Sequence, residues 1–264
     1  MAAKLDRERV RGLVEPHWRR VYNFLFRLTL DRDRAERYLA DVFATAAQQD
    51  IPGNESDREV WLLGIANQIA EERLPRQPEI NFDTLDETLR SEATRTDVVR
   101  SLNDPQRDFL LWEMKQGCMT AVVNCLPPGE RAAFVVCHVL KLPDEAAAKS
   151  LGITESAYKV RLSRARKKVG DYLAPRCEHV NPMNPCRCPA RVGTALARGF
   201  IKQTTPPPTG EVSLRRQLVP YGKYGTGEGN DDAPMRDIGA IYGGLPEPDP
   251  PEDLGNRLIA QLSA

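Results

Sequence analysis

Four side chains that bind metal ions well lie close together in the C-terminal half of the sequence. Cys177, His179, Cys186 and Cys188 fall within twelve residues. Three thiols and one imidazole suit a tetrahedral site for zinc, and two thiols separated by one residue also suit copper(I). Because C-x-H-x6-C-x-C is not a standard zinc-finger spacing, inert reduced thiols or a redox pair are the alternative.

A second group of residues could bind nucleic acid. Residues 159–168 include six basic residues and no acidic one. Lys and Arg neutralise phosphates, and Arg can also bind the acceptor atoms of guanine in the major groove. A solvated basic helix is the ordinary alternative. The candidate DNA-binding residues are Thr154, Ser156, Lys159, Arg161, Ser163, Arg164, Arg166 and Lys167.

Two predicted helices position these basic residues. Residues 144–151 are good helix formers with Asp144 as the expected N-cap, and Gly152 then permits a tight turn. Thr154 is the expected N-cap of the second helix, on which apolar residues recur at intervals of three and four. This expected buried stripe consists of Tyr158, Leu162, Ala165 and Val169. Two helices joined by a short turn containing Gly are typical of a helix-turn-helix.

The N-terminal part of the chain predicts a small helical domain over residues 10–75. Helices are expected from about Val14, over residues 34–48 and over residues 57–73, each with one apolar face. Pro16 is expected near the start of the first helix, where proline is tolerated. The polar face of the second helix, which includes Glu36 and Asp41, is available to a partner.

The expected fold is all-α, with two small helical domains and several further segments. A linker over residues 76–106, with a short helical stretch near residues 85–90, leads to a helix-turn-helix domain over residues 107–175. A Cys/His-rich segment follows over residues 176–198. The tail, residues 199–264, is rich in Pro and Gly, which predicts disorder over most of its length. Apolar residues in helical register over residues 251–262 suit a short terminal helix, and a frayed end is the equally weighted alternative.

Charge and composition limit the possible functions. The chain has no formal net charge, but residues 107–198 are basic on balance, so nucleic acid should bind there. The absence of a bilayer-spanning apolar run or a signal peptide predicts a cytoplasmic protein without membrane association. Cys118, Cys125 and Cys137 are expected in the core. No catalytic constellation is apparent, so no catalytic residue is assigned and an enzyme is not expected.

Three stretches together resemble the bacterial RNA polymerase sigma factors of the extracytoplasmic-function group. The stretches are VYNFLFRLTLDRDRAERYLADVFATA (21–46), WLLGIANQIAEER (61–73) and LPPGERAAFVVCHVLKLPDEAAAKSLGITESAYKVRLSRARKKV (126–169). With the intervening sequence, the resemblance covers roughly residues 10–175. Some members of the group also carry a metal-sensing Cys-rich extension, to which residues 176–198 are similar.

The resemblance implies two promoter-reading domains that bind core RNA polymerase. The first would bind the polymerase clamp and open the minus-ten element, and the recognition helix of the second would read the minus-thirty-five element. Carried over by position, the minus-ten contacts are expected around residues 65–73 and the minus-thirty-five contacts around residues 156–166. The polymerase-binding residues would be Glu36, Arg37, Ala40 and Asp41. An anti-sigma protein is a further possible partner.

A different class of function remains open at this stage. The chain could be a stand-alone helix-turn-helix regulator that binds an operator, usually as a dimer on a palindrome. Residues 10–75 argue against this alternative, because such a regulator has no need of them. Co-purification with core polymerase distinguishes the two.

Overall fold

The structure is a computed structural model of the chain, and it describes residues 7–91, 104–181, 183–197, 237–245, 248 and 250–263. Every regular element in these residues is a helix, which confirms the predicted all-α fold class. The chain divides into two compact units. The first comprises Met1–Glu79, Leu126–Ala165 and Glu247–Ala264, and the second comprises Ile80–Cys125 and Arg166–Pro246.

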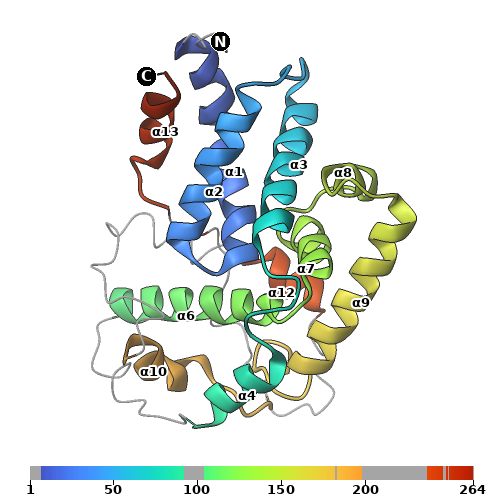
Figure 1. Cartoon of the computed structure of the whole chain (residues 1–264). Coiled ribbons are helices and arrows are strands. Elements are labelled where there is room, and N and C mark those ends of the chain that lie inside the picture. Colours follow the sequence, from blue (N-terminus) through green and yellow to red (C-terminus); the bar gives the residue numbers. More distant parts are fainter. Residues whose placement is uncertain are drawn as a thin grey trace. The chain divides into compact units, whose positions relative to one another are not determined.

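Three helices of the first unit lie side by side and form a bundle (Figure 1): α1 (Arg7–Thr29), α2 (Arg32–Ala46) and α3 (Glu55–Arg73). Their apolar faces meet in a core that includes buried apolar residues from all three helices. The side chains of Asp31 and Asn54 accept backbone N–H groups in the first turns of α2 and α3. These caps stabilise the helix starts, because the first N–H groups of a helix have no partner within it.

Helix α1 begins at Arg7, which corrects the expected start near Val14 and places Pro16 in the helix interior. An interior proline lacks an N–H donor and costs roughly 3 kcal/mol. Val10, Leu13 and Val14 are all buried before the proline, so the packed face of α1 continues through it. Burial of this apolar surface offsets the cost, which explains why the helix does not begin at the proline.

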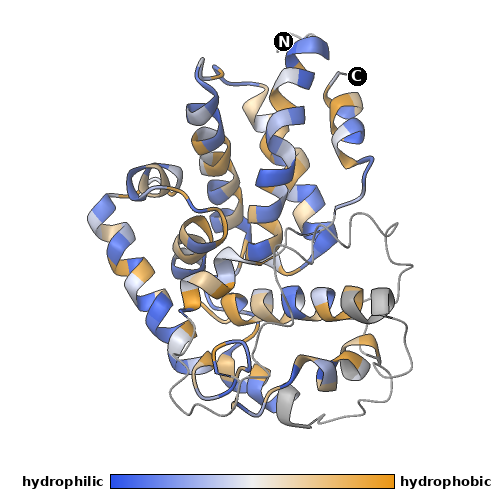
Figure 2. Ribbon diagram, turned by 180° about the vertical axis from the view of Figure 1, so that it is seen from behind, coloured by the Kyte–Doolittle hydropathy of each residue, from blue (hydrophilic) through white to orange (hydrophobic). Residues whose placement is uncertain are grey.

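The helix-turn-helix is present as predicted. Helix α7 (Pro128–Phe134) continues into a π-helical turn (Val135–Val139), and α8 (Asp144–Ser150) and α9 (Glu155–Leu173) follow. In Figure 2, hydrophobic residues recur at intervals along α9 between stretches of hydrophilic ones. The predicted stripe is confirmed, because all four of its side chains are buried: Tyr158, Leu162, Ala165 and Val169.

The turn between α8 and α9 has the expected geometry, but the start of α8 differs from the prediction. Gly152 has a φ of 63°, in the left-handed region that only glycine adopts easily. The Thr154 hydroxyl accepts the N–H of Ala157 at 3.2 Å, which confirms Thr154 as N-cap. Asp144, in contrast, is the first helical residue and does not cap α8, because Pro143 occupies the N-cap position.

Within the first unit, two arginines tie the helix-turn-helix to the bundle. Arg131 of α7 is buried, and its guanidinium donates to the carbonyls of Leu28 and, at 3.1 Å, Leu126. Arg20 of α1 donates to the carbonyl of Leu140 at 2.5 Å. A buried guanidinium is costly unless its N–H groups are bonded, so these contacts specify how α7 lies against α1.

The second unit is built around α6 (Asp104–Asn124). Its described residues also include the last part of α9, α4 (Phe82–Ser91), the short 3-10 helix Cys188–Arg191, α10 (Val192–Ala197) and α12 (Ile238–Gly243). Buried apolar residues join α6 to the segment after the Cys/His loop: Phe109, Leu110, Leu111, Met114, Cys188, Val192 and Ala195. The helical stretch expected near residues 85–90 of the linker is present as α4.

The two units do not follow the order of the chain. Helix α6 belongs to the second unit, whereas α7, α8 and the first part of α9 belong to the first, with the N-terminal bundle. The apolar side chains of α6 pack against residues beyond Cys188, and this long-range pairing is not visible in local sequence patterns.

The end of the chain forms the predicted helix, α13 (Leu254–Ser263), with Leu254, Leu258 and Ile259 buried. The expected disorder of the tail concerns mainly residues 198–236, which lie outside the described residues. None of the described helices combines the length and the hydrophobicity that a membrane span requires.

Candidate nucleic-acid interface

The exposed face of α9 in the first unit is the candidate DNA-binding surface. The side chains of Ser156, Lys159, Ser163 and Arg164 are all exposed on it. Together with Glu155 and Val160 they line a shallow, open depression. The buried stripe of α9 holds the helix by its opposite side, so this face presents hydroxyl and basic groups to solvent.

Val160 was not among the predicted contacts, although it lies in the middle of this face. It is 48% exposed, which is unusual for a large apolar side chain in this protein. An apolar side chain among exposed polar ones would suit the methyl group of thymine if this face met DNA. Its position opposite the buried stripe was the feature of the sequence that could have identified it.

The predicted contact Lys159 forms ion pairs with two neighbouring carboxylates. The Lys159 ammonium lies 3.2 Å from a carboxylate oxygen of Glu155 and 3.7 Å from one of Asp144. The hydrogen bond to Glu155 is the main cause that raises the pKa of Lys159. Exposed pairs of this kind contribute little stability, so phosphate groups can replace the carboxylates at low cost. Lys159 therefore stays charged and available to DNA.

Arg161, another predicted contact, lies away from the open face. Its guanidinium approaches Gly129 so closely that a Cβ there would lie 2.9 Å from Nη1, and it is 4.0 Å from a carboxylate oxygen of Glu71. Both neighbours belong to the first unit. The structure therefore does not bring Arg161 together with Lys159 and Arg164.

The last two predicted contacts, Arg166 and Lys167, lie further along α9, in the second unit. Both side chains are exposed. Lys167 pairs with Asp171 at 2.8 Å, and this hydrogen bond is the main cause that raises the pKa of Lys167.

The predicted polymerase-binding residues occupy one side of α2. The apolar residues of α2 face the core, so Glu36, Arg37, Ala40 and Asp41 are left partly or fully exposed. Asp41 pairs with Arg73 of α3. A protein that binds α2 would meet this charged row first.

The stretch expected to contact the minus-ten element, residues 65–73 of α3, has one exposed side. Ile65, Asn67 and Ile69 are buried, whereas Gln68, Glu71, Glu72 and Arg73 are exposed. Two of the exposed residues pair with other parts of the first unit, Arg73 with Asp41 and Glu71 with Arg161.

The Cys/His loop of the second unit gathers donors at its buried end. The Sγ of Cys188 lies 3.3 Å from Nε2 of His179, and both residues are buried. Ligand atoms of Glu178, His179 and Cys188 all lie within 4.8 Å of one another. With tetrahedral bonds of about 2.3 Å to sulfur and 2.0–2.1 Å to nitrogen, zinc would separate two such donor atoms by roughly 3.5 Å. The observed spacing fits that geometry.

The two remaining predicted ligands, Cys177 and Cys186, are not part of this group of donor atoms. The backbones of Cys177 and Cys186 lie side by side, with Cys186 N donating to the carbonyl of Arg176 at 3.0 Å. Burial raises the pKa of the Cys177 thiol to about 11 and that of Cys188 well above its ordinary value.

Two further residues near the loop were not predicted as ligands. The Glu178 carboxylate accepts the backbone N–H of Cys188 at 2.6 Å, so it closes the loop as well as joining the donor group. Cys118 of α6 packs against the apolar cluster that contains Cys188, where burial raises the pKa of its thiol. Cys118 was expected in the core, but it is only half-buried at the edge of this cluster, which adjoins the candidate metal site.

The fold and the open face of α9 define a protein of the helix-turn-helix class. Residues 116–169 match the family described as Sigma-70, region 4. The chain is 27% identical over 163 residues to the ECF RNA polymerase sigma factor SigE of Mycolicibacterium smegmatis. These matches confirm the predicted resemblance to extracytoplasmic-function sigma factors. The alignment covers 61% of this chain and 60% of the relative, so the chain spans less than two thirds of its length. No solved structure is significantly similar.

Proposed function

We propose that this protein is a sigma factor that directs core RNA polymerase to specific promoters. The observation that carries the proposal is the exposed basic face of α9, which lies within a segment that matches sigma-70 region 4. A sigma factor contributes binding and positioning, and the catalytic step of RNA synthesis belongs to the polymerase. This function therefore needs no catalytic residue in the chain itself.

The N-terminal part of α9 would enter the major groove of the minus-thirty-five element. The recognition helix of a helix-turn-helix contacts base edges mainly with its first residues. Here those residues include Ser156, Lys159, Val160, Ser163 and Arg164, which combine phosphate-binding, guanine-binding and methyl-binding groups. The combination suits sequence-specific recognition better than uniform attraction to phosphates.

The bundle of the first unit would provide the polymerase contact and the minus-ten contact. On α2, the row from Glu36 to Asp41 faces away from the core and is available to the polymerase. On α3, the exposed Gln68 and Arg73 are the side chains best placed to contact the promoter strand. Arg73 would exchange its partner Asp41 for a phosphate.

Transcription in vitro from a promoter library tests this function. Core polymerase should start transcription at a defined set of promoters only when the protein is added. The Lys159→Ala/Arg164→Ala variant should lose this selectivity. The Arg11→Ala/Arg76→Ala variant removes two exposed basic residues elsewhere and should retain it. DNA binding that is independent of polymerase, without promoter-specific transcription, would instead indicate a stand-alone regulator.

We also propose that the Cys/His loop binds one zinc or copper(I) ion, which modulates transcription. Cys188 and His179 supply the buried donor pair, and Cys177 and Cys186 would complete the set. A bound ion would cross-link the loop that follows the last turn of α9. The chain's own contribution is to keep the donors together, because Glu178 holds the backbone of Cys188 in place.

The metal content of the purified protein tests this second proposal. The Cys186→Ser/Cys188→Ser variant should lose bound metal, whereas Cys137→Ser, a control outside the loop, should keep it. Equal metal content in the two variants would show that the Cys/His loop does not bind the metal. A difference in metal content with equal promoter-specific transcription would leave a structural site without regulation.

A further inference from the structure

We propose that the C-terminal helix α13 competes with core polymerase for the exposed side of α2. A docked α13 would then inhibit polymerase binding from within the same chain. This inference rests on the proposed sigma-factor function. It concerns contacts within the first unit only, because α13 and the N-terminal bundle both belong to that unit.

Helix α13 packs against α1 and α2 of the bundle. Leu254, Leu258 and Ile259 are each only 3% exposed. A Cβ on Gly255 would lie 2.8 Å from Nε1 of Trp18, so the helix backbone lies directly against the indole. A larger residue at position 255 could not occupy the same place.

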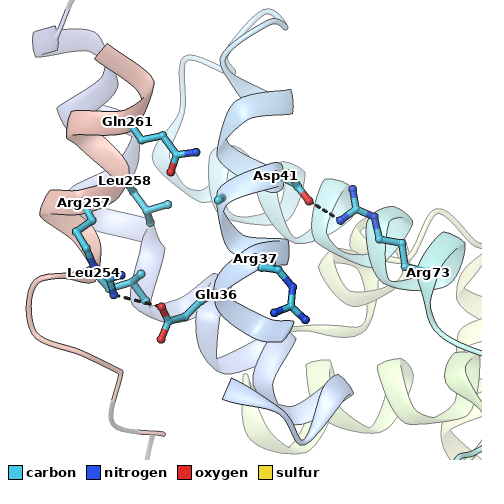
Figure 3. A pocket seen from close by; sticks show the side chains of 9 residues that line it. Glu36, Arg37, Asp41, Arg73, Leu254, Arg257, Leu258 and Gln261 are labelled. Atoms are coloured by element: carbon cyan, nitrogen blue, oxygen red, sulfur yellow. Dashed lines mark hydrogen bonds and ion pairs between the residues drawn. The ribbon is translucent and has the colours of Figure 1, made fainter. Parts of the chain in front are cut away.

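The same helix forms one wall of a groove that has the exposed side of α2 as its floor (Figure 3). The groove has a volume of about 430 Å³, and its opposite wall includes Arg73. Its floor consists of the four predicted polymerase-binding residues: Glu36, Arg37, Ala40 and Asp41. The side chains of α13 that face them are Leu254, Arg257, Leu258 and Gln261.

Arg257 of α13 also engages one of the floor residues directly. Its Nη2 lies 3.2 Å from a carboxylate oxygen of Glu36, as the dashed line in Figure 3 indicates. The Glu36 side chain is 24% exposed in this arrangement. A partner that used Glu36 would first have to displace Arg257.

The size of a protein interface explains why α13 has to move. Stable interfaces bury about 800 Å² on each partner, which is far more than four residues on one helix face can supply. A polymerase surface centred on the floor of the groove would therefore extend beyond α2. On one side it would meet α13.

The contacts of α13 are also suited to release. A helix of ten residues is marginal by itself in water, so α13 is stable as a helix mainly while docked. Arg257 remains 53% exposed, and its pair with Glu36 is open to solvent and salt. A tighter-binding partner can therefore displace the helix.

Polymerase affinity of the wild-type chain and of three point variants tests this inference. Gly255→Leu places a side chain where Trp18 lies, and Arg257→Glu sets two carboxylates against each other at Glu36. Both variants should release α13. If the helix is docked about nine-tenths of the time, affinity for core polymerase should rise about tenfold, because only the undocked form competes for binding. Asn256→Ala, an exposed position on the same helix, should leave the affinity unchanged.

A synthetic peptide of residues 248–264 provides an independent measurement. Added in excess to the Gly255→Leu variant, the peptide should lower the variant's affinity for polymerase toward that of the wild-type chain. An Arg257→Glu peptide should do so less. If the wild-type chain and both releasing variants bound polymerase equally well, this inference would be wrong, but the proposed function would stand. Weaker binding by the variants would also overturn the inference and would make α13 part of the polymerase contact. If no form bound polymerase, the proposed function would fail, and this inference with it.

Discussion

The residues of the α9 face differ in what they can recognise, and substitutions should separate their roles. Arg164→Ala should cost about 1–3 kcal/mol in promoter binding and relax the preference at one base pair if Arg164 reads guanine. Lys159→Ala should weaken binding to all sequences and lower the salt slope by about one. Arg161→Ala should have the smallest effect, because its guanidinium lies beside Gly129 and Glu71. Salt-dependent binding to promoter and random DNA measures all three.

If Arg161→Ala instead weakened DNA binding most of the three variants, the Arg161 side chain would have to leave Glu71 when DNA binds.

Also at the residue scale, zinc affinity of the Cys/His loop should depend on pH. Burial raises the pKa of the Cys177 thiol to about 11, so this thiol must lose its proton to bind zinc. Affinity should therefore rise with pH through the neutral range and fall as the solution is acidified. Competition titrations with a zinc chelator at several pH values measure this. An affinity independent of pH would argue against thiolate ligands.

At the scale of single elements, the exposed side of α2 can be altered without loss of the fold. Asp41→Lys removes an ion pair whose partners, Asp41 and Arg73, are each 44% exposed. Such pairs contribute between zero and about 1 kcal/mol, so thermal unfolding should change little. Binding to core polymerase should weaken, because a carboxylate in the proposed contact becomes an ammonium.

Gln48→Lys, at an exposed position beyond the end of α2, is a suitable control for the added charge. Unchanged polymerase binding by the Asp41→Lys variant would exclude Asp41 from the contact.

At the scale of the whole molecule, Arg131 connects two segments that lie far apart in the sequence. Arg131→Ala would leave the carbonyls of Leu28 and Leu126 without this donor inside the first unit. An unsatisfied buried polar group costs about 1–3 kcal/mol, so chemical denaturation should show a loss of at least that size. Glu130→Ala, at the neighbouring and less buried position, should cost less.

An Arg131→Ala variant as stable as the wild type would indicate that water replaces the guanidinium.

Local patterns were sufficient to predict the individual helices and the helix-turn-helix. The stripe from Tyr158 to Val169, the turn at Gly152 and the cap at Thr154 all depend on spacing and backbone preference within a few residues. The apolar register of residues 254–262 also indicated the terminal helix, with a frayed end as the alternative. These features are local, because hydrogen bonds and apolar periodicity within a helix involve residues three or four apart.

Tertiary structure alone decided which of these parts meet. Periodicity shows that a helix has an apolar face but not which partner buries it, so the seating of α13 beside α2 was not predictable. For the same reason, the sequence could not show that Arg161 turns toward Glu71 while Arg164 stays exposed on the same helix. The packing of α6 against the segment after Cys188 is likewise a long-range contact. Such contacts depend on the shape and charge of both surfaces, which only the folded chain brings together.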